Sequence, residues 1–91
     1  MSFRRGWLRR GCIYSDEGFS VGIVDKTGLL YREGRRKMTI GGELLVNGFV
    51  VYQSSIGPWN DGAAVDDAKR TQIVRNITRA LESQGLSVDI D

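Results

Sequence analysis

Hydrophobic and polar residues alternate through the first half of the chain, in short runs that turn residues separate. Two of these runs, 19–23 and 37–40, show the period of two that a half-buried β-strand produces. In the second run the two apolar residues would lie on one face of a strand, with Lys37 and Thr39 on the other. These runs are therefore predicted to be strands with one face in a core.

Turn signals divide the runs and predict how the strands connect. The sequences DKTG at 25–28 and EGR at 33–35 supply turn chemistry. The pair Gly41-Gly42 is expected to break the strand before it, and Asn47-Gly48 is the strongest signal for a two-residue hairpin. The pattern predicts a meander of four to five antiparallel strands between residues 12 and 52.

After a 13-residue connection at 53–65, which includes one tryptophan, the period becomes helical. Apolar residues at i, i+4, i+7 and i+8 form one stripe, made of Ile73, Ile77, Ala80 and Leu81. Asp66 or Asp67 is expected to cap this helix, and Gly85 suits its C-terminal end. Residues 86–91 alternate again. The predicted fold class is α+β, an antiparallel β-meander of about five strands packed against one C-terminal helix, with a short final strand that could pair in parallel.

Composition is that of a globular protein, with 91 residues, 41% of them hydrophobic and 26% charged. We expect a basic N-terminal arm or edge strand at 1–11 and a single α+β domain at 12–91. The one cysteine, Cys12, excludes an intramolecular disulfide and suits a reducing compartment. Because the chain has no run of about 18 apolar residues, we expect a cytoplasmic protein without a membrane partner.

The residue types available for catalysis are few. The chain has no histidine, which removes the commonest general base and the usual transition-metal ligand. No GxxxxGK[ST] or GxGxxG loop is present to cradle phosphates. The adjacent carboxylates of Asp66 and Asp67 are explained by helix capping. We therefore expect a protein that binds a partner without catalysing a reaction, and that needs neither a metal nor a cofactor.

Three stretches resemble a family of small bacterial immunity proteins from polymorphic-toxin and contact-dependent growth inhibition systems. They are YREGRRKM at 31–38 with ELL at 43–45, YQSSIGPW at 52–59, and the helical residues Asp66 or Asp67, Ile73, Asn76 and Ile77. The resemblance implies a function: tight binding of the C-terminal domain of one cognate toxin, which blocks its active site or its access to substrate.

Binding energy in interfaces concentrates in Trp, Tyr and Arg. The predicted contact residues therefore lie in or beside the turn at 33–35 and the connection at 53–65: Tyr31, Arg32, Arg35, Arg36, Tyr52, Trp59, Asn60 and Asp61. For Trp59 two interpretations stay open, a contact residue or a ring that closes the core beneath the loop.

A small nucleic-acid-binding module is the alternative interpretation. Seven of the 13 basic residues lie in two short segments, at 1–10 and 35–37, and aromatic residues accompany the first segment. Against this interpretation, the net charge is only +2 and 11 acidic residues are spread along the chain. Nucleic acid is therefore the less favoured partner.

Overall fold

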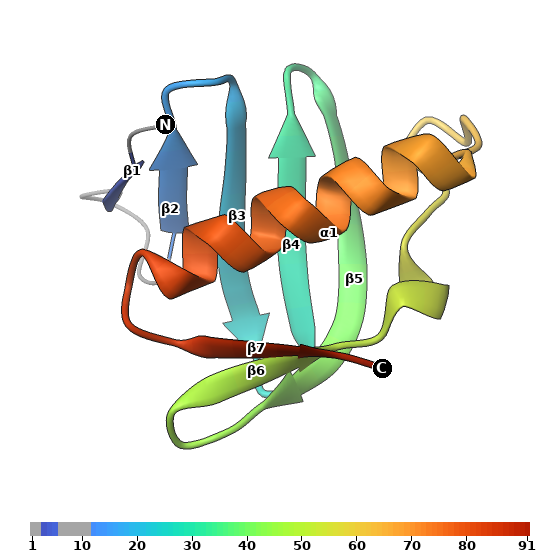
Figure 1. Ribbon diagram of the computed structural model, residues 1–91. Helices are drawn as coiled ribbons and strands as arrows, with labels where there is room; N and C mark the ends of the chain where they lie inside the picture. The colour runs from blue at the N-terminus through green and yellow to red at the C-terminus, as the bar shows by residue number, and fades with distance from the viewer. Residues whose placement is uncertain (1–2, 6–11) are drawn as a thin grey trace.

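Among residues 3–5 and 12–91, which the computed structural model describes, seven strands form one sheet in chain order (Figure 1). The strands are β1 (Phe3–Arg5), β2 (Cys12–Ser15), β3 (Phe19–Asp25), β4 (Gly28–Glu33), β5 (Arg36–Leu44), β6 (Gly48–Val51) and β7 (Ser87–Ile90). Neighbouring strands are antiparallel except β6 and β7, which are parallel. The predicted α+β meander with a C-terminal helix is confirmed, with a higher strand count than expected.

The N-terminal segment is described only in part. Phe3–Arg5 form β1, which pairs with β2 at one edge of the sheet. The rest of the predicted basic arm, at 1–2 and 6–11, lies outside the described residues. The division of the chain into 1–11 and 12–91 therefore stays a prediction.

Strand β5 does not break at Gly41-Gly42, and the prediction that it would was wrong. The strand runs on to Leu44 and changes partner at this point, because Gly41 pairs with β4 and Gly42 with β6. A Cβ on Gly42 would lie 2.2 Å from the Val50 carbonyl oxygen and 2.3 Å from Phe49 Cε1. Glycine serves here as the site where another strand approaches closely, and it does not end the strand.

The connection between β5 and β6 is also longer than the two residues predicted from Asn47-Gly48. Residues 45–47 form it, and Leu45 N–H donates to the Gly48 carbonyl at 2.8 Å. Gly48 is already the first residue of β6, where a Cβ would lie 2.5 Å from Ser87 Oγ. The glycine is thus explained by close packing against β7, which only the tertiary fold brings there.

The helix α1 (Asp67–Glu82) follows the predicted pattern closely. Asp66 is its N-cap, with a carboxylate that accepts from Lys69 N–H at 2.7 Å. All four residues of the predicted apolar stripe are fully buried. After the last turn, Gly85 has φ +83°, as a C-terminal glycine in the left-handed region should. The chain then forms β7 alongside β6, with Ser87 opposite Gly48.

The helix lies across one face of β2, β3, β4 and β5, and the β6–β7 pair runs below it (Figure 1). Side chains alternate between this covered face and the opposite one. A row of cross-strand neighbours on the covered face, Ile13, Val21, Tyr31 and Met38, is at most 4% exposed. The adjacent row, Tyr14, Ser20, Arg32 and Lys37, points away from the helix. The core therefore lies between sheet and helix.

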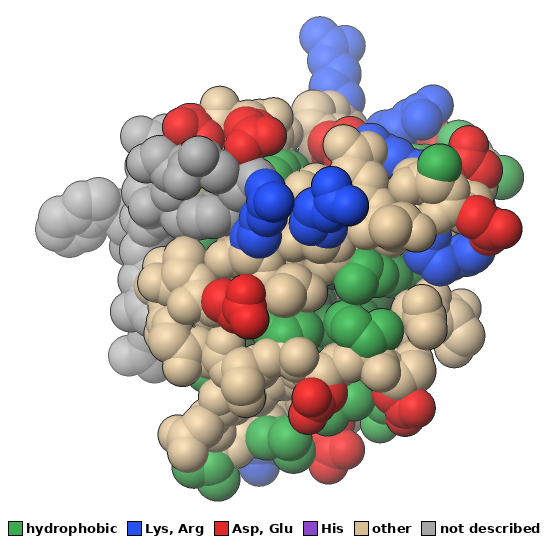
Figure 2. Space-filling view, in the orientation of Figure 1, with side chains coloured by type: hydrophobic (Ala, Val, Ile, Leu, Met, Phe, Trp, Pro, Cys, Tyr) green, Lys and Arg blue, Asp and Glu red, His purple; other side chains and the backbone are tan. Residues whose placement is uncertain are grey.

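Figure 2 shows the molecule from the helix side, where basic and acidic side chains lie around the helix, and acidic and hydrophobic side chains predominate over the strands below it. Within the described part of the chain, no helix is long and apolar enough to cross a membrane.

Candidate functional site

The connection between β6 and α1 is fastened to the outer edge of β5 at two points. Because β6 pairs with β5 only from Gly42 onward, the earlier part of this edge is left to the loop. At one point Ser55 Oγ accepts from Gly41 N–H at 2.7 Å. At the other, Asn60 Oδ1 accepts from Lys37 N–H at 2.9 Å, and Asn60 N–H donates to the Lys37 carbonyl at 2.8 Å. The loop thus satisfies backbone groups that an open edge would expose.

Asp61 holds the tip of this loop against the β4–β5 hairpin. Its Oδ1 accepts from Ala63 N–H at 2.9 Å, and its Oδ2 accepts from Arg36 Nε at 3.1 Å. The hydrogen bond from Ala63, with the charge of Arg36 adding to it, holds the pKa of Asp61 below its usual value. Both side chains of the ion pair are about half exposed. The pair therefore contributes little to the stability of the protein, and both side chains are accessible from solvent.

A series of ring contacts links this exposed ion pair to the core. The Trp59 ring is 4% exposed, and its centroid lies 6.1 Å from that of Tyr31. Tyr31 stacks in turn on Phe19, at 5.9 Å between centroids. On the outer side, Arg36 Cζ lies 6.0 Å from the Trp59 ring centroid, within cation–π range. The position of Arg36 is therefore supported from below by the aromatic core.

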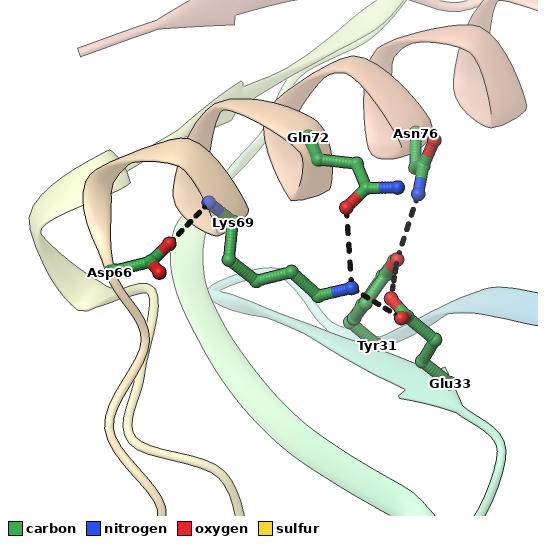
Figure 3. Close-up of polar contacts among 6 residues, drawn as sticks. All are labelled: Tyr31, Glu33, Asp66, Lys69, Gln72 and Asn76. Carbon is green, nitrogen blue, oxygen red and sulfur yellow. Dashed lines mark hydrogen bonds and ion pairs between the residues drawn. The ribbon is translucent and has the colours of Figure 1, made fainter.

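A polar network joins β4 to the helix next to these rings (Figure 3). The Tyr31 hydroxyl donates to Glu33 Oε2 at 2.7 Å and accepts from Asn76 Nδ2 at 2.9 Å. Lys69 on the helix forms an ion pair with Glu33 and also donates to Gln72 Oε1 at 3.3 Å. Five polar side chains thus fasten α1, between Lys69 and Asn76, to the end of β4.

Burial and hydrogen bonding shift two pKa values in this network. Burial raises the pKa of the Tyr31 hydroxyl well above its usual value, and the neighbouring Glu33 carboxylate adds to the shift against the hydrogen bond from Asn76. For Glu33, burial acts to raise the pKa, but hydrogen bonds from Lys69 and Tyr31 outweigh it and hold the pKa below its usual value. Tyr31 is therefore neutral and Glu33 ionised at neutral pH.

These polar groups are arranged to hold one another in place. The carboxylates of Glu33 and Asp61 each have a cationic partner. Among the described residues, no group of three or more His, Cys, Asp or Glu side chains is placed to hold a metal ion. The arrangement can present a rigid surface of charged and amide groups, which is a property of binding sites.

Comparison with known proteins places the chain in a family. A family model described as Immunity protein 74 matches residues 23–91, more than half of the chain. The chain belongs to the Immunity protein 74 family. Comparisons with curated proteins and with solved structures gave no match. The resemblance found in the three sequence stretches is thus confirmed: this is an immunity protein of a polymorphic toxin system.

In this member of the Immunity protein 74 family, five of the eight predicted contact residues come together. Arg36, Trp59, Asn60 and Asp61 meet where the loop touches the β4–β5 hairpin, and Tyr31 lies beneath them. Arg35 is exposed at the turn of the same hairpin. Of the two interpretations of Trp59, the buried ring favours the one that closes the core, while the neighbouring Asn60 and Asp61 are exposed.

The other two predicted residues lie apart from this cluster. Arg32 points to the opposite face of the sheet, because it alternates with Tyr31 along β4. Tyr52 is 37% exposed and donates its N–H to the Gly41 carbonyl at 2.9 Å. Tyr52 therefore lies beside Gly41, where the pairing of β5 with β4 ends, whereas Lys37 lies near the start of that pairing.

Sequence analysis did not single out the network of Glu33, Lys69 and Asn76 as a unit. A signal was present in Asn76, a polar residue next to Ile77 on the apolar stripe, because a polar residue there needs a buried partner. No signal in the sequence named that partner as Tyr31, which is 45 positions away.

Proposed function

We propose that this immunity protein neutralises a cognate toxin by binding the C-terminal domain of the toxin and blocking its active site or its access to substrate. Membership in the Immunity protein 74 family supports a toxin as the partner. The observation that carries the rest is the loop–hairpin surface, defined as the exposed side chains of Arg35, Arg36, Asn60 and Asp61. Within this surface Arg36 lies over the buried Trp59 ring and forms an ion pair with Asp61.

Rigidity is what makes this surface suited to tight binding. A partner that meets flexible side chains loses affinity to the entropy of ordering them, whereas a preorganised surface avoids much of that cost. Asn60 is tied to the Lys37 backbone by two hydrogen bonds, and Asp61 to Ala63 and Arg36. Arginine above an aromatic ring is also the composition of interface hot spots.

The proposal assigns no reaction to the chain. Inhibition by occlusion needs only complementary surface, so neither a catalytic group nor a cofactor is required. We further propose that the protein acts in the cytoplasm, where a single unpaired cysteine such as Cys12 is compatible with the reducing conditions.

The direct test identifies the toxin and then measures its inhibition. Tagged protein is recovered from the native host in high salt, and any stoichiometric partner is identified by mass spectrometry. The C-terminal domain of that partner is then purified, its binding to the immunity protein is titrated, and its toxicity is measured with and without the immunity protein. We expect one-to-one binding and loss of toxicity.

Matched variants show whether the loop–hairpin surface is the contact. Arg35→Ala at the exposed β4–β5 turn should weaken binding by about tenfold or more, as truncation of an interface arginine does. Lys26→Ala is the control, because Lys26 is also an exposed cation, in the turn at the other end of β4. Recovery of no toxin domain, or a purified domain that stays toxic when fully bound, would overturn the proposal.

A further inference from the structure

The face of the sheet that the helix leaves open carries two cations directly opposite each other. Arg32 on β4 and Lys37 on β5 are cross-strand neighbours in the row that points away from the helix. Arg32 is half-buried and Lys37 is exposed. Like charges at directly opposite positions in a sheet destabilise it, so this arrangement has a cost that the free protein bears.

No ion pair among the described residues neutralises either cation. Three ion pairs occur there, and they involve Arg36, Lys69 and Arg70. Neither Arg32 nor Lys37 has a carboxylate within ion-pair distance among those residues. Arg36 differs from these two cations. It precedes Lys37 in β5, points to the other face of the sheet, and is neutralised by Asp61.

Two open pockets flank the cation pair. One, of about 220 Å³, is lined by Tyr14, Ser20 and Arg32 together with residues of the β2–β3 turn and Gly34. The other, of about 320 Å³, is lined by Leu30, Thr39, Pro58 and Asn60 together with Met38 and Lys37. Each cation therefore stands at the border of a hollow that also offers apolar surface.

We propose that this open sheet face, defined by Tyr14, Leu30, Arg32 and Lys37, receives an acidic segment of the toxin domain. This inference rests on the proposed function and adds the chemistry of the partner to it. One or two Asp or Glu side chains of the segment lie over Arg32 and Lys37, and the guanidinium can bind a carboxylate through two parallel hydrogen bonds. Neighbouring apolar side chains enter the flanking pockets.

The open sheet face adjoins the loop–hairpin surface. Asn60 belongs to both, since it lines the second pocket and is bonded to Lys37. A toxin domain bound to the loop–hairpin surface can thus contact the open face at the same time. A carboxylate bound there would lie against two cations that form no ion pair among the described residues, and such complementary charge favours association.

The test compares charge-neutralising variants on the two faces, using the purified toxin domain identified as described above. Arg32→Gln and Lys37→Gln should each weaken binding at least tenfold and make it less sensitive to salt. Their melting temperatures should be unchanged or higher than that of the wild type, because each removes a like-charge contact. Arg75→Gln, on the exposed helix face, is the control and should change neither property.

The outcomes separate this inference from the proposed function. If the wild type binds the toxin domain and both variants bind it equally well, the open-face inference is wrong and the proposed function stands. If the wild type binds no toxin domain, both are wrong. Tight, salt-sensitive binding of a single-stranded oligonucleotide that the two variants lose, without any effect on toxin binding, would reassign the open face to nucleic acid.

Discussion

The hydroxyl oxygen of Tyr31 lies between Glu33 and Asn76, donating to the Glu33 carboxylate at 2.7 Å and accepting from the Asn76 amide at 2.9 Å. Tyr31 is completely buried and Asn76 is 9% exposed. One phenol thus satisfies a buried helix side chain and orients a carboxylate of the sheet. Its ring meanwhile supports Trp59 beneath the loop–hairpin surface. The packing of α1 and the shape of the candidate site therefore depend on the same residue.

Tyr31→Phe should lower the free energy of unfolding by about 1–3 kcal/mol, because it leaves the buried Asn76 amide without its acceptor. Urea unfolding at neutral pH measures this. In the double variant Tyr31→Phe/Asn76→Leu, both polar partners are replaced by apolar groups, and much of the loss should be recovered. Simple addition of the two single losses would contradict the coupling between these residues.

The stability of the protein should fall in acid partly because of Glu33. Its pKa is below the ordinary value of 4.5 in the folded protein. Its stabilising effect is therefore fully present above that value and is lost as the pH falls through the lower, folded-state pKa. Glu33→Gln should remove this part of the acid sensitivity, so the stabilities of wild type and variant should converge as pH decreases.

Urea unfolding at several pH values from about 6 down to 3 checks this convergence. Lys69→Met provides the companion variant, because it removes the cationic partner while leaving the hydrogen bond from Tyr31. It should abolish the acid sensitivity that Glu33 contributes, because burial, the largest single effect on this pKa, is then opposed only by the hydrogen bond from Tyr31. A constant difference in the free energy of unfolding between wild type and Glu33→Gln over the whole pH range would show that Glu33 does not cause this acid sensitivity.

Gly42→Ala and Gly41→Ala should behave very differently although they are neighbours in one strand. A Cβ on Gly42 would lie 2.2 Å from the Val50 carbonyl oxygen, whereas on Gly41 the nearest atom would be Ser55 Oγ at 3.4 Å. We expect Gly42→Ala to cost about 3 kcal/mol or more, at the upper end for overpacking, and Gly41→Ala about 1 kcal/mol or less. Thermal unfolding of both variants gives the comparison, and equal losses would show that the partner change at β5 tolerates a side chain.

Trp59→Ala should destabilise the protein by about 3–5 kcal/mol, as removal of a buried aromatic ring does. Asn60→Ala at the adjacent, exposed position should cost only about 1 kcal/mol, for one hydrogen bond to the Lys37 backbone. Thermal melts together with a toxin-binding titration distinguish a structural role of Trp59 in the core from a direct contact of Trp59 with the toxin. If Trp59→Ala hardly changes stability but weakens toxin binding, the ring acts as a contact and not as part of the core.

The local patterns were sufficient to predict the elements that repeat with a short period. The alternation at β3 and at Met38–Ile40, and the stripe at Ile73, Ile77, Ala80 and Leu81, predicted which side chains face the core. Capping by Asp66 was among the predicted choices. These features depend on neighbours within a few positions, so the sequence contains the information needed to predict them.

The β5–β6 hairpin predicted from Asn47-Gly48 is present, but the roles given to two glycines were wrong for one shared reason. Gly42 and Gly48 were interpreted as turn signals, although each lies in a strand where another backbone or side chain approaches too closely for a Cβ. The atoms responsible belong to Phe49, Val50 and Ser87, and nothing local identifies Ser87 as a neighbour. A glycine serves either purpose, and only the packed structure distinguishes them.

By itself, then, the sequence determined the fold class, the faces of the main strands and the helix, and the resemblance to immunity proteins that the family comparison confirmed. Tertiary structure alone decided that Trp59 is buried beneath Arg36, that Tyr31 meets Asn76, and that the helix covers the sheet face opposite to Arg32 and Lys37. The physical reason is distance along the chain. Periodicity acts over a few residues, whereas the candidate site is built from contacts between segments that only the folded sheet and the crossing helix bring together.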